Sequence, residues 1–249
     1  MDYQTTLGRR AARAVQFAER PRLARIHRSG LSVDQYVTLD RPWFRDLGIG
    51  CVVDIGANVG YFSKTMRAVL PEARIVAFEP IPTAFAALQT AFAGDPSVTA
   101  VEVAVGRESG TSTFHVNRYS DSSSIRPMTD VHRAHVPFTD GEQQQITVPV
   151  EPLDHYADLI GTDVPTFVKV DVQGFEDEVL AGGHTVLSRA KLVVVEVSFA
   201  PLYDGAPAFE DILATMSDLG LRYGGNLDQL RGPADGAILQ CDALFFRDR

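Results

Sequence analysis

Short apolar segments alternate with amphipathic segments along the chain from residue 51 onward. Continuous apolar runs bounded by turn residues are typical of buried strands, and apolar residues spaced three or four positions apart are typical of helices. The predicted strands are Cys51–Ile55, Arg74–Glu79, Val98–Val105, Thr166–Val172, Lys191–Ser198, Leu221–Gly224 and Ala237–Arg247. The predicted helices between them are Gly60–Leu70, Thr83–Phe92, Phe175–Leu187 and Ala208–Leu219. Strands that alternate with helices in this way form a mostly parallel sheet covered on both faces.

The segment 107–150 interrupts this alternation. Thr111–Val116 and Ile146–Val150 alternate like the strands of a small antiparallel hairpin, and the polar stretch Asn117–Gln144 joins them. A loop of this length in a compact domain is typically a lid over a site or a disordered segment. We therefore predict a hairpin and loop inserted into the sheet, with a loop that orders when a ligand fills the site.

The residues before the first strand have a helical pattern. A helix is predicted over 3–29, interrupted at Pro21, and a second helical region over Ser32–Asp46. The predicted organisation is an N-terminal helical appendage, residues 1–46, followed by a Rossmann-like doubly wound α/β domain, residues 47–249.

Composition and charge narrow the class of protein. The chain has 249 residues, of which 45% are hydrophobic and 22% charged, which is ordinary for a globular domain with a real core. A net charge of −9 argues against broad nucleic-acid binding, because phosphate neutralisation needs clustered Lys and Arg. Residues 1–30 nevertheless hold seven arginines against two acids. That excess is either a patch for an anionic partner or membrane surface, or the solvated face of a helix.

Targeting signals and cysteine spacing add three expectations. No apolar stretch is long enough for a membrane span, and the first thirty residues lack a signal-peptide pattern, so we expect a cytoplasmic protein without stable membrane insertion. Cys51 and Cys241 match no metal spacing and are expected to be buried free thiols. A homodimer is compatible with the sequence.

A glycine-containing turn follows the first predicted strand, with the sequence Asp54-Ile55-Gly56-Ala57-Asn58-Val59-Gly60. Ligands of doubly wound sheets collect at the carboxyl ends of the strands. Gly56 permits a tight turn, and Gly60 is expected to let the helix begin close to a ligand. The first glycine of the dinucleotide pattern is missing, and a carboxylate at this position suits a ligand that carries an ammonium and a sulfonium.

A second acidic residue, Glu79, ends the next predicted strand, 25 residues after Asp54. An acid at this position is placed to accept hydrogen bonds from both hydroxyls of a ribose. Pro80 directly after it stops the strand and fixes the direction in which the carboxylate leaves it.

Five blocks of this sequence resemble FkbM-type methyltransferases: VVDIGANVGYFS at 52–63, AFEP at 77–80, VAVG at 103–106, VPVEPLD at 148–154 and VKVDVQGFEDEVL at 168–180. The resemblance implies a class I methyltransferase fold with an antiparallel last strand, S-adenosylmethionine as the methyl donor, and O-methylation of a sugar or polyketide hydroxyl. It implies that the donor is held by Asp54, Gly56, Asn58, Gly60 and Glu79, with Ala104 and Val105 beside its adenine. Gln173 departs from the family, which often has Glu there.

Further donor contacts are predicted at Tyr61, Pro80 and Asp171, which lie inside these blocks, and at Ser124 in the polar stretch. Ser124 ends a serine-rich run that either hydrogen-bonds the donor or a sugar, or is a flexible turn. The resemblance does not extend to residues 1–45.

Methyl transfer to a hydroxyl needs a group that takes the hydroxyl proton. Asp171 ends one predicted strand and Glu196 lies late in the next, so the two could flank one cleft. Asp171 either holds the donor's ammonium, acts as the base, or coordinates Mg²⁺ with Glu196 or Asp177. Lys169 is either a buried partner of an acid or catalytic. Glu176 is either a first-turn helix carboxylate or a functional acid.

Histidines of the polar loop are alternative bases. His132 and His135 reach a substrate if that loop closes over the cleft, and the usual pKa of histidine suits proton transfer. Exposed loop histidines that only contact solvent are the competing interpretation for both.

Two other functions fit part of the pattern. A glycine turn with an acidic strand end also marks NAD-dependent oxidoreductases, but the missing first glycine and the absence of a Tyr-x-x-x-Lys pair count against that class. A donor-binding partner subunit without catalytic activity is the non-enzymatic alternative. The sequence does not identify the acceptor beyond a small molecule or sugar.

Overall fold

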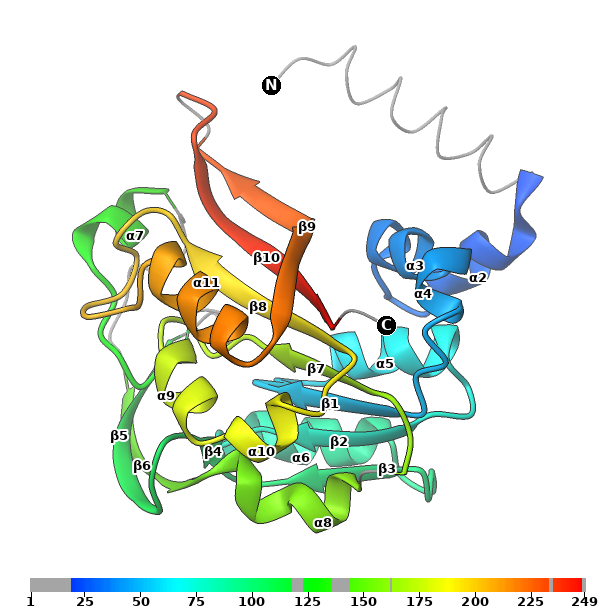
Figure 1. Cartoon of the computed structure of the whole chain (residues 1–249), viewed down its shortest axis with the longest axis horizontal. Coiled ribbons are helices and arrows are strands. Elements are labelled where there is room, and N and C mark those ends of the chain that lie inside the picture. The colour runs from blue at the N-terminus through cyan, green and yellow to red at the C-terminus, as the bar shows by residue number, and fades with distance from the viewer. Residues whose placement is uncertain (1–18, 118–122, 136–143, 162, 233–234, 248–249) are drawn as a thin grey trace.

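The computed structural model describes residues 19–117, 123–135, 144–161, 163–232 and 235–247. Within them, a central sheet has the strand order β3-β2-β1-β7-β8-β10-β9 (Figure 1). Its strands are β1 (Cys51–Ile55), β2 (Arg74–Phe78), β3 (Val98–Val101), β7 (Thr166–Val170), β8 (Leu192–Ser198), β9 (Leu221–Arg231) and β10 (Ile238–Arg247). All neighbours pair in parallel except β10, which is antiparallel to both β8 and β9. This arrangement confirms the predicted doubly wound fold with an antiparallel last strand.

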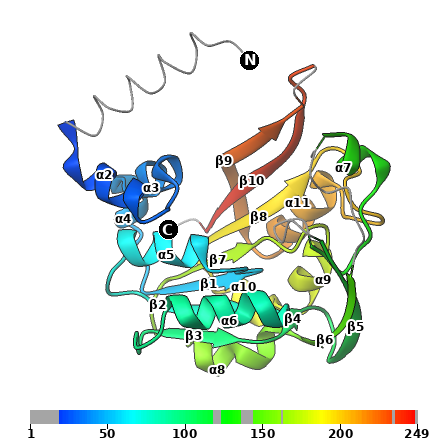
Figure 2. The same ribbon diagram turned by 180° about the vertical axis from the view of Figure 1, so that it is seen from behind.

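Helices cover both faces of the sheet because successive strand residues point to opposite sides. On one face, alternate strand residues such as Val53 and Val168 pack against α8 (Ala157–Ile160), α9 (Glu176–Ala181), α10 (His184–Leu187) and α11 (Phe209–Asp218). The opposite face packs against α5 (Tyr61–Val69) and α6 (Pro82–Ala91). Figure 2 shows this second layer from behind.

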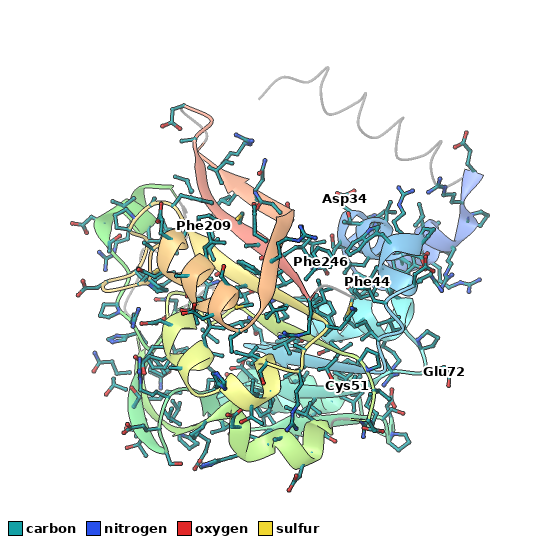
Figure 3. All side chains as sticks on the ribbon, in the orientation of Figure 1. Asp34, Phe44, Cys51, Glu72, Phe209 and Phe246 are labelled. Carbon is teal, nitrogen blue, oxygen red and sulfur yellow. The ribbon has the colours of Figure 1, made fainter. Side chains whose placement is uncertain are left out.

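Three N-terminal helices extend that second layer: α2 (Pro21–Arg28), α3 (Val33–Leu39) and α4 (Pro42–Arg45). Their buried residues belong to the same hydrophobic cluster as α5 and the sheet. Phe44 packs edge to face on Phe167 of β7, with ring centroids 5.5 Å apart, and Figure 3 shows it where α4 meets the sheet layer. The helices therefore share the core of the sheet. The domain boundary between residues 46 and 47 stays a prediction.

A second, three-stranded sheet has the order β4-β6-β5 and stands beside the first. Its strands are β4 (Ala104–Val105), β5 (Gly110–Val116) and β6 (Gln144–Glu151). The pairing of β5 with β6 is antiparallel, as predicted for the inserted hairpin. The loop between them contains α7 (Asp130–His135), and residues 118–122 and 136–143 of the predicted lid lie outside the described residues.

Two predicted elements are wrong in detail. The single strand expected over Val98–Val105 is two strands, because β3 joins the large sheet and β4 pairs with β6 in the small one. The single helix expected over Phe175–Leu187 is split into α9 and α10 at Gly182. A Cβ at Gly182 would lie 1.9 Å from the carbonyl oxygen of Gly106, so the chain passes too close there for any other residue.

The structure also bears on the predictions for the two cysteines, the last strands and membrane insertion. Cys51 and Cys241 are buried free thiols, as predicted. The strand expected at Leu221–Gly224 continues to Arg231, and a short 3-10 helix, η2 (Leu153–Tyr156), precedes α8. Among the described residues no helix has the length and apolar character that crossing a membrane requires. The cytoplasmic location and the homodimer stay predictions.

Candidate active site

The glycine turn after β1 is shaped by close backbone contact. Gly56 has φ +81°, and a Cβ there would lie 1.9 Å from the carbonyl oxygen of Asp171, so the turns after β1 and β7 meet at this glycine. Gly60 has φ +82°, but its missing Cβ faces Leu88 and Phe92 rather than a ligand. The prediction that Gly60 lets the helix begin close to a ligand is therefore corrected. Gly60 lets α5 begin against the neighbouring α6 layer.

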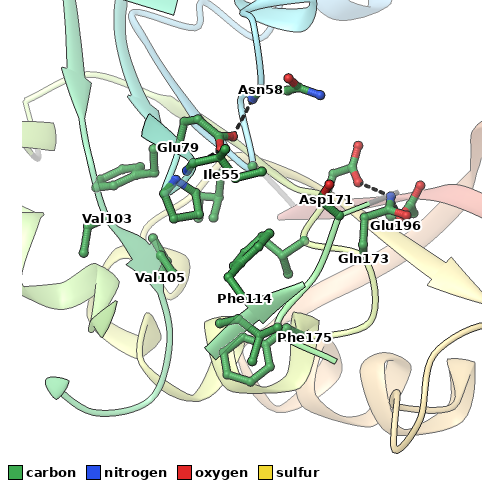
Figure 4. A pocket seen from close by; sticks show the side chains of 18 of the residues that line it. Ile55, Asn58, Glu79, Val103, Val105, Phe114, Asp171, Gln173, Phe175 and Glu196 are labelled. Carbon is green, nitrogen blue, oxygen red and sulfur yellow. Dashed lines mark hydrogen bonds between the residues drawn. The ribbon is translucent and has the colours of Figure 1, made fainter. Parts of the chain in front are cut away.

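A cavity of about 370 Å³ lies at the carboxyl ends of β1, β2 and β7 and beside β8. This is the edge at which doubly wound sheets bind ligands, and the volume suits a small-molecule site. Acidic, amide and histidine side chains meet apolar ones on its wall (Figure 4). Of the predicted site residues, it is lined by Gly56, Asn58, Glu79, Pro80, Ala104, Val105, His132, Asp171 and Glu196.

Glu79 forms the acidic end of the cavity next to β2. It is buried, and its two carboxylate oxygens accept the backbone N–H groups of Asn58 and Ile81, each at 2.8 Å. Burial raises the pKa of Glu79 to about 7, against these two hydrogen bonds, which lower it. The carboxylate is thereby held in one orientation, and each oxygen keeps a lone pair for a ligand hydroxyl.

Apolar side chains form the wall between Glu79 and the far end of the cavity. Val103 and Val105 follow β3, Phe114 comes from β5, and Phe175 precedes α9. Figure 4 shows them around one hollow, with Glu79 above Val103 and Val105. Such a wall suits a flat, largely apolar ring.

Three polar side chains meet at the far end. The side-chain nitrogen of Gln173 donates to Oδ1 of Asp171 at 2.8 Å and to Oε2 of Glu196 at 2.5 Å (Figure 4). The other oxygen of Asp171, Oδ2, accepts from Nζ of Lys169 at 2.7 Å. The two acids predicted to flank one cleft are therefore joined through the amide of Gln173, and Lys169 is a buried partner of an acid.

The pKa values of Asp171 and Glu196 are shifted in opposite directions. Burial raises the pKa of Asp171, but the ammonium of Lys169 and the hydrogen bonds from Lys169 and Gln173 outweigh it and lower the pKa below its usual value. Burial, followed by repulsion from Asp171 and Glu176, raises the pKa of Glu196 well above its usual value. Asp171 is therefore ionised at neutral pH, whereas the protonated form of Glu196 is favoured.

His132 reaches the same cavity from α7. It is 3% exposed, and neither ring nitrogen has a hydrogen-bond partner among the described residues. Burial, with a smaller contribution from the charge of Arg133, lowers the pKa of His132, so its imidazole is neutral at pH 7. An unpartnered buried imidazole on a cavity wall can accept a proton from a bound ligand.

Several predicted site residues lie outside the cavity lining. Asp54 is fully buried, and its Oδ2 accepts from the hydroxyl of Ser63 on α5 at 2.6 Å. Burial raises the pKa of Asp54, and the charge of Lys169 acts against this. Tyr61 is 57% exposed at the start of α5. Gly60 and Ser124 also do not line the cavity, and the side chain of His135 is outside the described part of the chain.

Ser124 has a structural contact instead of a ligand-facing one. Its hydroxyl donates to the carbonyl oxygen of Gln173 at 2.6 Å, and the neighbouring Ser123 lines the cavity. Glu176 likewise holds a turn, because its Oε1 accepts the N–H groups of Val172 and Gly174 at 3.2 and 3.1 Å.

The predicted magnesium site is not supported. Among the described residues, no group of three or more His, Cys, Asp and Glu side chains has a geometry that could hold a metal ion. The Lys169 ammonium, 2.7 Å from Asp171, already neutralises the acid that was expected to be a ligand.

Other lining residues were not predicted. They come from distant strands and loops, and include Phe114, Ile125, Phe175, Leu230 and Gln240. Tyr203, which contacts Gln173 and His132 from the loop after β8, was also missed. No local motif marks these residues, since only the fold brings them to this edge of the sheet.

The fold and the position of the cavity define the class of protein: the doubly wound sheet with a final antiparallel hairpin is a class I methyltransferase fold. The chain belongs to the FkbM methyltransferase family, because residues 54–223 match the model described as the methyltransferase FkbM domain. Membership of this family argues against the alternative function of an NAD-dependent oxidoreductase.

Three similar proteins illustrate the relationship. The 2-O-methyltransferase NoeI of Sinorhizobium fredii is 28% identical over 170 residues, which are 65% of this chain and 69% of that protein. Methyltransferase 1 of Beauveria bassiana is 30% identical over 145 residues, 53% of this chain and 57% of that protein. The structure of Aeropyrum pernix fibrillarin with bound S-adenosyl-L-methionine has a TM-score of 0.45 and 13% identity, over 80% of this chain and 67% of that one.

Proposed function

We propose that this protein transfers a methyl group from S-adenosylmethionine to a hydroxyl oxygen of a small molecule or sugar. The observation that carries the proposal is a single cavity with Glu79 at one end and His132, Asp171 and Glu196 at the other. The family and the 2-O-methyltransferase relative support the same reaction.

The residues present fit the donor. Glu79 is buried, fixed by two backbone N–H groups and faces the cavity, as an acceptor for ribose hydroxyls needs to be. Val103, Val105 and Phe114 offer an apolar wall for the adenine, and Ala104 lies between the two valines. When bound, the donor supplies an electrophilic methyl group on a sulfonium. The cavity volume of about 370 Å³ is sufficient for a ligand of nucleoside size.

The proton of the acceptor hydroxyl goes to His132 in this proposal. Asp171 is a weak base because Lys169 and Gln173 stabilise its ionised form, and the raised pKa of Glu196 favours its protonated form. His132 is neutral, buried and without a partner among the described residues. Asp171 and Glu196 then bind and orient the acceptor, Asp171 by accepting and Glu196 by donating a hydrogen bond.

Two measurements test the proposal. Calorimetry with S-adenosylhomocysteine is expected to show binding to the wild-type protein and to the exposed-site control Glu72→Gln, and weaker binding to Glu79→Gln. Incubation with a donor that carries a trideuterated methyl group and a panel of sugars and hydroxylated natural products is expected to give a labelled product. Binding without turnover on any acceptor would favour the partner subunit without catalysis, and absence of binding would reject the donor.

A further inference from the structure

Gln173 occupies a strained position next to the cavity. Its φ is +57°, in the left-handed region that residues other than glycine rarely adopt. The hydroxyl of Ser124 donates to its carbonyl oxygen at 2.6 Å. Gly174, the next residue, has φ +95°, and a Cβ there would lie 2.6 Å from the Cβ of Tyr203. Strain that neighbouring contacts maintain at a cavity wall indicates a positioned group.

The contacts of the Gln173 side chain select one orientation of its amide. An amide has two N–H donors on nitrogen and only acceptor capacity on oxygen. The nitrogen faces one oxygen of Asp171 and one of Glu196, at 2.8 and 2.5 Å. The oxygen accepts the hydroxyl hydrogen of Tyr203. In the flipped orientation the amide oxygen would face the ionised Asp171, and the Tyr203 hydroxyl would lose its acceptor.

Tyr203 also contacts the proposed base. It is 1% exposed, and its ring meets that of His132 edge to face, with centroids 5.0 Å apart. A backbone bridge pairs Tyr203 with Met128, just before α7. One side chain therefore touches both the amide that joins the two acids and the histidine that stands in the same cavity.

We propose that Tyr203 and Gln173 form a positioning unit, in which Tyr203 fixes the amide so that Asp171 and Glu196 each receive one of its N–H groups while His132 is held against the tyrosine ring. The effect of this unit on catalysis rests on the proposed function, whereas the arrangement of its side chains does not.

An amide does at this position what a carboxylate cannot. It joins two acids without titrating itself, while Lys169 favours the ionised form of Asp171 and burial favours the protonated form of Glu196. A glutamate at position 173 would bring a third acid within hydrogen-bond distance of the other two, and the three would have to share protons. The positioning unit therefore sets the pH range over which the charges of Asp171 and Glu196 stay constant.

The test uses Tyr203→Phe, which keeps the ring and removes the hydroxyl. Its matched control is Tyr223→Phe on β9, where the hydroxyl donates to Asn226 and does not line the cavity. Nitrogen-15 correlation spectra report the side-chain amide of Gln173, which is assigned by its absence in Gln173→Glu. In Tyr203→Phe this amide signal is expected to shift, and its hydrogens to exchange with water at least about tenfold faster, because a fixed hydrogen bond is lost. The control is expected to match the wild type.

With an accepted substrate, Tyr203→Phe is expected to lower kcat by about tenfold or more while the KM for the donor stays unchanged. Gln173→Glu is expected to add an ionisation to the pH profile of kcat/KM. Wild-type exchange together with wild-type kcat in Tyr203→Phe would overturn the unit. If that variant does not fold, an unaltered pH profile in Gln173→Glu would overturn it. A wild-type protein that shows the fixed amide but binds no S-adenosylhomocysteine would reject the proposed function and leave the unit standing.

Discussion

Glu176→Gln is expected to reduce the pH dependence of stability without changing the fold. Glu176 is 3% exposed, and its Oε1 accepts the N–H groups of Val172 and Gly174. Glutamine has the same shape and an oxygen that accepts the same two hydrogen bonds. The substitution therefore removes the titration of a buried acid and preserves the turn that carries Asp171 and Gln173.

The magnitude follows from the pKa. Burial raises the pKa of Glu176 from 4.5 to about 7. The folded state then binds this proton more tightly than the unfolded state, so the free energy of unfolding falls as the pH rises from about 4.5 to about 7. At 1.36 kcal/mol per pH unit, the loss from this one group is about 3 kcal/mol.

Denaturant unfolding followed by circular dichroism at intervals from about pH 4.5 to about pH 7.5 measures this loss. The wild-type curve is expected to fall with pH more steeply than the curve of Glu176→Gln. The decline that remains in the variant comes from Glu79 and Asp242, whose pKa values burial raises to about 7 and about 6, and from Asp54 and Glu196, whose pKa values burial also raises. The exposed control Glu72→Gln is expected to follow the wild type. Parallel curves for the wild type and Glu176→Gln would refute the reasoning.

Three further variants test individual residues of the site. Glu79→Ala is expected to weaken S-adenosylhomocysteine binding by about 2–4 kcal/mol, and calorimetry that finds the affinity unchanged would reject the ribose contact. Gly56→Ala should melt far below the wild type because its Cβ would meet the carbonyl oxygen of Asp171, whereas Gly94→Ala, with a similar φ and open space, should lose much less. His132→Asn is expected to lower kcat by about a hundredfold or more with donor affinity retained, and a near-normal kcat would assign the base elsewhere.

The periodicity of apolar residues was sufficient to predict the sheet and most of its helices. Strands such as Cys51–Ile55 are buried along their whole length and mostly apolar because helices cover both of their faces, and the sequence records that burial directly. The break inside Val98–Val105 is different. Both halves, β3 and β4, are extended, so their apolar pattern is the same whether they belong to one sheet or to two. Only the pairing of β4 with the distant strand β6 places it in a different sheet from β3.

The candidate site was predictable only where a residue lies at the end of a strand. Glu79, Asp171 and Glu196 reach the cavity because strand ends in a parallel sheet share one edge. Gly60 was misread because a glycine shows that space is short, and the sequence does not say which neighbour fills it. Tyr203 carries no sequence signal, because its importance comes from contacts with residues 30 and 71 positions away.

In the proposed reaction, the charge pattern of the cavity explains why several acids can surround an acceptor hydroxyl without preventing its ionisation. Asp171 is neutralised by Lys169, whose own pKa is raised by Asp171 and Asp54 against the effect of burial. Burial, followed by repulsion from Asp171 and Glu176, favours the protonated form of Glu196. The local field is therefore less negative than the count of carboxylates suggests. Each of these groups already has a polar partner, whereas neither ring nitrogen of His132 has a hydrogen-bond partner among the described residues.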